Sequence, residues 1–285
     1  MSSRAFRFAV VAALPSAERS WAETVRRIEG FGYSTVQVPD TLGTFATFPA
    51  LAAAATATTT LRVGAYVIAA PNHRPAAVAH EALSVDILSG GRLELGLGAG
   101  RPDSEHEAAA LGLPFGTPGE RMALLRETVR EVRERFAKPQ GPLQPVQKPH
   151  PPITIAATGP RMLRLAAEEA DVVALGLAAQ TTEDELAAKT AELREYAGAD
   201  RFEQIELAYS LSVVGREASP WMRRWLGADP EQLLAIGAVA AVDGTPQEMA
   251  DVLRRRRDRT GVSYFQVSEP FAEAFAPVVE LLAGT

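Results

Sequence analysis

Short apolar segments alternate with longer amphipathic ones along this chain, and no other feature constrains its fold so strongly. The short segments are often β-branched, which is typical of buried strands, whereas the longer ones carry helical periodicity. We expect strands at 6–13, 35–38, 61–68, 93–97, 153–157, 171–175, 205–213 and 263–267. We expect helices at 17–29, 48–58, 75–88, 118–136, 160–169, 182–196, 246–260 and 272–282.

These eight strand-helix units indicate a single α/β domain over residues 1–285. Parallel strands are joined by right-handed crossovers, and eight of them close a sheet into a barrel. A (β/α)8 or TIM barrel takes about 250 residues, so this chain has room for a modest insertion. A doubly wound open sheet is the alternative.

Two segments interrupt the alternation. Residues 138–152 are proline-rich and cannot form a helix, so we expect them to cross the surface in extended form. Residues 215–240, after the seventh strand, are expected to form a short helical insertion. Trp221 and Trp225 within this insertion suggest a lid or a packing cap.

Composition excludes several classes of function. The chain has no cysteine, which rules out disulfides and thiolate chemistry, and its formal charge of −6 argues against a nucleic-acid surface. It has no apolar run of about 18 residues and no recognisable signal peptide, so we expect no membrane contact and a cytoplasmic location. The basic run 254–257 is interpreted as a solvated helix face, with phosphate binding as the alternative.

Glycines follow the fourth expected strand. Gly98 and Gly100 alternate with Ala99 and Arg101, so a ligand could approach the backbone there. Pro102 argues against the helix that a dinucleotide-binding fingerprint would require. A tight exit from the strand is the alternative. Arg101 could hold an anion or a ring carbonyl, or could pair with Asp103 or Glu105.

The carboxyl ends of barrel strands carry the active site, so three further places are candidates. Asp40 follows the second strand and is either a carboxylate at the mouth or a cap of the next loop. His73 follows the third, and we favour a loop or capping role because the sequence identifies no partner carboxylate. After the fifth, residues 158–161 open a helix whose free N–H groups could hold a phosphate, a plain cap being the alternative.

Several of these segments carry a family resemblance. Residues 88–96 read Leu-Ser-Gly-Gly-Arg-Leu-Glu-Leu-Gly, and the segments 32–40, 51–64, 105–121, 152–161 and 242–262 surround them in a familiar order. In that order the chain resembles the luciferase-like monooxygenase superfamily, and within it the F420-dependent oxidoreductases, over nearly its whole length. One departure is Thr41, where many relatives have a histidine.

The resemblance implies a barrel that binds the deazaflavin coenzyme F420, or alternatively FMN, at its mouth. Asp40 would lie near the ring as the catalytic candidate, and Val67 to Ala69 would form a bulge that is often built around a non-proline cis peptide. The implied cofactor-binding residues are Asp40, Val67, Ile68, Ala69, Gly98, Ala99, Gly100, Arg101, Thr158, Gly159, Pro160 and Arg161.

The function expected from this resemblance is hydride transfer between F420 and a small organic substrate of the enone, imine or alcohol type. An FMN-dependent luciferase-like monooxygenase and a non-catalytic flavin-fold binding protein are the alternatives. A metal-dependent hydrolase is disfavoured, because the four histidines show no ligand spacing. The resemblance also implies a homodimer.

Overall fold

Eight parallel strands close into a barrel in the computed structural model, which describes residues 4–12, 14, 18–101 and 104–285. Around the barrel run β1 (Arg7–Val11), β2 (Thr35–Val38), β3 (Arg62–Ala65), β5 (Leu93–Gly98), β6 (Ile153–Ala157), β7 (Val172–Leu175), β8 (Glu206–Leu211) and β11 (Val262–Ser268). Pairing of β3 with β5 and of β11 with β1 leaves no open edge. The structure therefore confirms the (β/α)8 barrel and excludes the open sheet.

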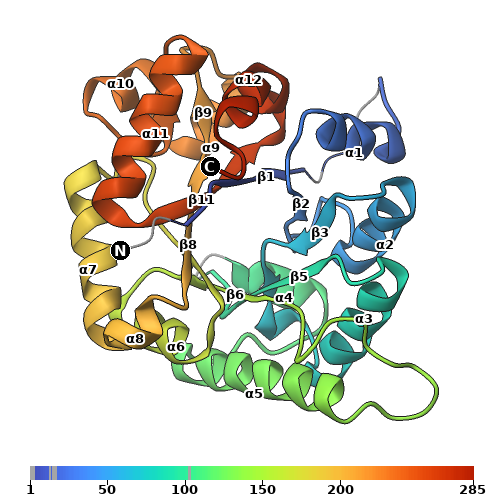
Figure 1. Ribbon diagram of the computed structural model, residues 1–285. Coiled ribbons are helices and arrows are strands. Elements are labelled where there is room, and N and C mark those ends of the chain that lie inside the picture. The colour runs from blue at the N-terminus through green and yellow to red at the C-terminus, as the bar shows by residue number, and fades with distance from the viewer. Residues whose placement is uncertain (1–3, 13, 15–17, 102–103) are drawn as a thin grey trace.

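Helices surround the strands in Figure 1. They are α1 (Trp21–Gly30), α2 (Thr47–Ala57), α3 (Pro75–Leu88), α5 (Pro118–Ala137), α6 (Pro160–Glu169), α7 (Glu183–Ala197), α11 (Pro246–Thr260) and α12 (Ala272–Leu282). Four of them begin with a capping box, formed by Ser20, Thr117, Thr182 and Thr245 with the glutamate three residues on. The expected strand end at Ala13 and helix start at Ala17 lie outside the described residues.

Two expected strands are each divided in the structure. The third becomes β3 and β4 (Ile68–Ala69), separated by a cis peptide bond between Tyr66 and Val67. The seventh becomes β8 and β9 (Val213–Val214), and β9 pairs with β10 (Ala241–Val242) in a separate small sheet. In both cases the apolar run continues in the sequence although the pairing changes: β4 keeps β5 as a partner but does not pair with β2, and β9 leaves the barrel sheet.

The insertion after the seventh strand contains two short helices, α9 (Pro220–Leu226) and α10 (Pro230–Ala235), as predicted. Met222 and Leu226 of α9 are buried in the main hydrophobic core, which fits a packing cap. The side chains of Trp221 and Trp225 lie outside the described part of the structure. The short elements α4 (Glu105–Ala110), α8 (Ala199–Phe202), η1 (Ala70–Asn72) and η3 (Glu269–Phe271) were not predicted.

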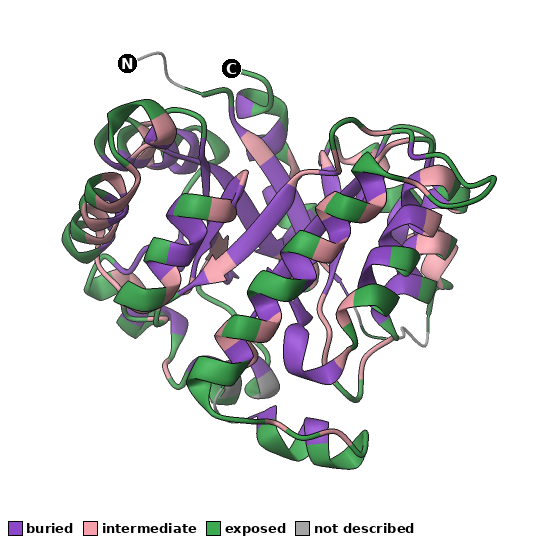
Figure 2. Ribbon diagram, turned by 90° about the horizontal axis from the view of Figure 1, so that it is seen from below, coloured by how far each residue is buried: buried purple, intermediate pink, exposed green. Residues whose placement is uncertain are grey.

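The hydrophobic core lies mainly between the strands and their helices, and Figure 2 shows the buried strands enclosed by helices with exposed outer faces. A second, small apolar cluster joins Ala9, Val172, Ala208 and Tyr264 from four different strands. The proline-rich segment is mostly irregular, and Asp86 of α3 fixes it by accepting hydrogen bonds from the backbone N–H groups of Val146 and Gln147. No helix within the described residues is long and apolar enough to span a bilayer.

Candidate active site

Asp40 and His73 meet at the carboxyl end of the barrel. Asp40 follows β2, His73 follows η1, and His73 Nε2 lies 2.8 Å from Asp40 Oδ2. The same oxygen accepts a 2.9 Å hydrogen bond from the N–H of Ala69. The backbone of His73 ends η1 as a loop residue, but its side chain has the partner carboxylate that the sequence did not identify. The expectation of a loop or capping role is therefore incomplete.

The environment of His73 favours its protonated form. Burial lowers the pKa of the imidazole. The hydrogen bond that His73 donates to Asp40, the negative charge of Asp40 and the charge of Glu81 outweigh this effect and raise the pKa above its ordinary value. The side chain of His73 is 28% exposed, so its proton can reach a ligand at the mouth. An imidazolium held by a carboxylate is suited to donating a proton near neutral pH.

The bulge and the glycine loop lie next to each other, because Ile68 pairs with Leu97 and Ala69 pairs with Gly98. A Cβ atom at Gly98 would lie 2.8 Å from Val67 Cγ2, so the bulge occupies the space that this glycine leaves. The packing of the bulge therefore requires a glycine at position 98, with or without a ligand. Whether Gly98 also lines a cofactor stays a prediction, as it does for Val67, Ile68 and Ala69.

Arg121 of α5 braces the loop after β5. Its Nε donates a 3.0 Å hydrogen bond to the carbonyl of Ala99, and its guanidinium lies over the ring of Phe115. Gly100 has a φ of +74°, and a Cβ atom there would lie 3.1 Å from Pro71 Cγ. Arg101 is exposed, with Glu107 at 3.9 Å, while Pro102 and Asp103 lie outside the described residues. The loop thus has an internal support that the sequence did not reveal.

Positively charged side chains and backbone N–H groups without a side-chain cap lie together at the start of α6. Gly159 is the N-cap and provides no side-chain cap, Pro160 follows it, and Thr158 and Arg161 are exposed. Lys189 of α7 donates a hydrogen bond to the carbonyl of Thr158, which brings a second cation to this end of the helix. A helix start with nearby cations is an arrangement that favours phosphate. Lys189 was missed because it lies on a different element.

Three polar side chains meet inside the upper barrel, and the sequence did not single out any of them. Tyr66 Oη lies 2.9 Å from Ser210 Oγ and donates to Gln266 Oε1 at 3.3 Å. Ser210 and Gln266 are register partners on β8 and β11. Recognising which strand positions point inward would have found them, because polar residues at such positions are unusual in a strand interior.

A separate network of charges fills the lower barrel. Glu94 of β5 accepts hydrogen bonds from Arg7, from Arg62 Nε at 2.7 Å and from Tyr264 Oη at 2.9 Å. Arg7 also pairs with Glu206 at 2.8 Å. These residues lie at or near the amino ends of their strands, so the network closes the barrel from below.

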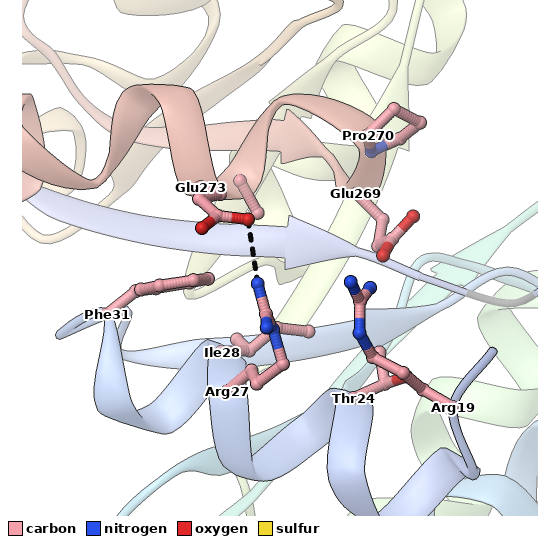
Figure 3. A pocket seen from close by; sticks show the side chains of 9 residues that line it. Arg19, Thr24, Arg27, Ile28, Phe31, Glu269, Pro270 and Glu273 are labelled. Carbon is pink, nitrogen blue, oxygen red and sulfur yellow. Dashed lines mark hydrogen bonds and ion pairs between the residues drawn. The ribbon is translucent and has the colours of Figure 1, made fainter. Parts of the chain in front are cut away.

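A groove of about 220 Å³ lies outside the barrel, between α1 and the η3–α12 segment. Figure 3 shows that its charges face each other, with Arg27 bonded to Glu273 and Arg19 directed toward Glu269. This groove is not connected to the groups described above by any shared residue. Within the described residues, no cluster of three histidine or acidic side chains could hold a metal ion.

Comparisons with known proteins identify the family. The sequence profile described as luciferase-like monooxygenase matches residues 6–264. The oxygenase component of a flavin-dependent trigonelline monooxygenase from Acinetobacter baylyi is 32% identical over 113 residues, which cover 35% of this chain and 31% of that protein. The match thus spans about a third of that relative.

Solved structures share the fold along the whole chain. The coenzyme F420-dependent tetrahydromethanopterin reductase from Methanopyrus kandleri superposes with a TM-score of 0.72 at 16% identity, covering 98% of both chains. The monooxygenase RslO1 from Streptomyces bottropensis gives 0.69 at 21% identity, covering 96% of this chain and 97% of that one. The profile match over most of the chain shows that this protein belongs to the luciferase-like monooxygenase family.

Proposed function

We propose that this protein is an F420-dependent oxidoreductase that transfers a hydride between the deazaflavin and a small organic substrate such as an enone, imine or alcohol. The observation that carries the proposal is the Asp40–His73 pair at the barrel mouth. Hydride addition to a carbonyl or imine leaves an anionic oxygen or nitrogen that must be protonated, and His73 can donate that proton. His73 then takes the role of the histidine that many relatives have at the position of Thr41.

The residues present fit such a cofactor. Its phosphate requires an anion site, and the start of α6 offers N–H groups together with Arg161 and Lys189. Nothing lies within 4 Å of the position that a Cβ atom of Gly159 would occupy, so a ligand can approach the backbone closely. The ring would lie at the mouth beside Asp40, the bulge at Val67 to Ala69, and the loop from Gly98 to Arg101.

The protein's own contribution to the reaction is positioning and proton supply. When bound, the reduced deazaflavin supplies the hydride. Asp40 holds the His73 ring through Nε2 and stabilises its imidazolium, as a carboxylate does in other histidine pairs. The charged start of α6 holds the cofactor's anionic end away from the reacting atoms. In the reverse direction, His73 accepts the proton of an alcohol.

Two other functions remain as alternatives, each with an observation in its favour. The curated relative is a flavin-dependent monooxygenase component, which favours FMN and reaction with oxygen. Thr41 at the position where many relatives have a histidine favours a non-catalytic flavin-fold binding protein. The cytoplasmic location and the homodimer stay expectations from the resemblance.

A fluorescence titration with F420 and with FMN separates these possibilities. We expect F420 to bind more tightly, and the F420-loaded protein to transfer a hydride to members of an enone and imine panel, measured as loss of reduced deazaflavin absorbance. Clear preference for FMN would replace this proposal with the monooxygenase. Binding of F420 without turnover on any panel member would favour the binding protein.

The variant Arg161→Ala tests the anion site. We expect about a tenfold loss of cofactor affinity with unchanged folding stability, because the exposed Arg161 makes no packing contact that folding requires. Arg164→Ala is the matched control: it lies one turn later on α6, removes the same charge, and contacts Tyr196 instead. Equal affinities in the two variants would count against a phosphate at the start of α6.

A further inference from the structure

The ring of Tyr66 crosses the barrel. Tyr66 follows β3, and its hydroxyl contacts residues of β8 and β11. In the closed sheet β3 and β8 are separated by three strands in each direction, so they lie on opposite walls. The Tyr66 side chain therefore spans the interior and forms a floor between the mouth above and the Glu94 network below.

This floor is open on its upper side. Tyr66 and Ser210 both keep partial exposure, whereas Gln266 is only 1% exposed. The charged network of Arg7, Glu94 and Arg62 blocks the barrel from below, so we infer that the exposed parts of Tyr66 and Ser210 face the mouth.

The hydrogen bonds of the floor are incomplete. Gln266 Nε2 is buried and has no hydrogen-bond partner within the described residues. A buried amide donor without a partner costs about 1 to 3 kcal/mol, and such groups in native proteins commonly serve a function or meet a ligand or water. The amide lies directly beneath Tyr66 and accepts the hydroxyl proton through its oxygen.

Rotation of the Gln266 amide would change the direction in which the Tyr66 hydroxyl donates its hydrogen bond. With its nitrogen and oxygen exchanged, the amide donates to Tyr66 Oη, and the hydroxyl proton of Tyr66 becomes free to point upward. The oxygen and nitrogen of an amide have nearly the same shape, so this exchange needs no other movement. Burial raises the pKa of Tyr66, although the hydrogen bond with Ser210 opposes this, so the hydroxyl keeps its proton at neutral pH.

We propose that Tyr66, Ser210 and Gln266 form a substrate subsite that binds the carbonyl oxygen of an uncharged hydride acceptor, a ketone or an enone. The inference rests on the proposed function and specifies its substrate class. None of the three side chains carries a charge, so the subsite selects a neutral acceptor over a carboxylate or a phosphate. Tyr66 donates to the carbonyl oxygen, and Ser210 and Gln266 hold the Tyr66 hydroxyl in place. The three are positioning and binding residues, while the proton comes from His73.

The experiment uses cyclohexenone labelled with carbon-13 at its carbonyl, titrated into the full-length protein and followed by NMR. A hydrogen bond to the oxygen moves the carbonyl resonance downfield, which packing alone does not do. We expect this movement in the wild type, its loss in Tyr66→Phe, and about a fivefold weaker affinity in that variant. Cyclohexene, which has the same ring without the oxygen, should bind no better to the wild type than to Tyr66→Phe.

Two further variants keep the test decisive. Tyr33→Phe is the matched control, because it removes a buried tyrosine hydroxyl that bonds to the Ala272 carbonyl outside the barrel interior, and it should leave the resonance and the affinity unchanged. Ser210→Ala should reduce the downfield movement if Tyr66→Phe does not fold. Absence of cyclohexenone binding, an unmoved resonance in the wild type, or a movement kept in both Tyr66→Phe and Ser210→Ala would overturn the subsite. The readout needs no cofactor, so its result is independent of whether F420 or FMN binds.

Discussion

The lower and upper halves of the barrel interior solve the problem of buried polar groups in opposite ways. Below, Glu94 receives hydrogen bonds from two arginines and a tyrosine, and its side chain is 2% exposed. Above, the floor of Tyr66, Ser210 and Gln266 contains no charge and leaves one amide nitrogen unpartnered. The two halves are built from the same eight strands, so the difference lies in the residues and not in the fold.

This contrast separates stability from function. A closed network of charges is costly to break, because removing one partner leaves the others buried without compensation. An open set of neutral groups adds little to stability, and it keeps donors available for a ligand. Substitutions below should therefore reduce the free energy of unfolding without changing ligand binding at equal amounts of folded protein. Substitutions of Tyr66, Ser210 or Gln266 should weaken ligand binding and change the free energy of unfolding little.

Glu94→Gln should have the largest effect. The amide carries no charge to offset Arg7 and Arg62, so we expect the free energy of unfolding to fall by about 3 kcal/mol. Urea denaturation followed by circular dichroism measures this loss. The affinity for the cofactor, measured on the folded fraction, should stay within twofold of the wild type.

Glu206→Gln is the matched control for that prediction. Burial raises the pKa of Glu206, although Arg7 opposes this, so the protein already disfavours the charge of Glu206. Removing that charge should cost about 1 kcal/mol or less. Equal losses in the two variants would show that the lower barrel does not depend on Glu94 in particular.

Asp40→Asn should have an intermediate effect and should act through the pKa of His73. In the wild type this pKa is raised, so the stabilisation from the pair is fully present below the ordinary value of 6.5 and is lost as pH rises through the folded-state pKa. In the variant the pKa of His73 should fall. The loss of stability, about 1 kcal/mol at the partly exposed site, should be greatest in mildly acidic solution and should shrink as the pH rises.

An NMR titration of the histidine ring protons checks this prediction. His80 and His150 serve as internal references, because neither is among the described partners of Asp40. Their titration curves should coincide in the two proteins. A His73 curve that also coincides would mean that Asp40 does not control its protonation, and the proposed proton donor would lose its support.

Much of the fold could be predicted from the sequence, because local signals determine it. The helices Pro75–Leu88, Pro160–Glu169 and Pro246–Thr260 have the predicted bounds, since proline at the first position fixes their starts. The residue pattern did not predict the division of the third strand, although the family resemblance implied a bulge at Val67 to Ala69. The division depends on Gly96 of a neighbouring strand, where a Cβ atom would lie 2.1 Å from the Ala65 carbonyl oxygen.

The candidate site was harder to predict from the sequence, because its groups meet only in the folded barrel. Asp40 was identified from its position after a strand, but its partner His73 is 33 residues away and shares no periodic pattern with it. Ser210 and Gln266 lie on β8 and β11 and Tyr66 follows β3, and each reads as an ordinary strand residue in the sequence on its own. The ends of several strands, such as β2, β6 and β7, were predictable, whereas the pairing across the mouth required the closed sheet.

The smallest expected effects come from Gly159, the N-cap of α6, and Gly176, which follows β7 and lies against Thr158. They distinguish a glycine that packing requires from one that ligand binding requires. A Cβ atom at Gly176 would lie 2.3 Å from Thr158 Oγ1, so Gly176→Ala must turn this hydroxyl and should cost about 1 kcal/mol of stability. A Cβ atom at Gly159 would meet nothing within 4 Å, and its φ of −101° suits any residue. Alanine caps a helix less well than glycine but is less flexible in the unfolded chain, so Gly159→Ala should change stability by about 0.5 kcal/mol or less.

Cofactor affinity should respond in the opposite order. Gly159→Ala places a methyl group where the anion is proposed to approach, so we expect about a threefold loss of affinity, against at most about a twofold loss for Gly176→Ala. Thermal denaturation and the same fluorescence titration measure both quantities on both variants. If Gly159→Ala binds the cofactor as tightly as the wild type does, the anion does not approach this backbone, and the open space at Gly159 has no function in binding.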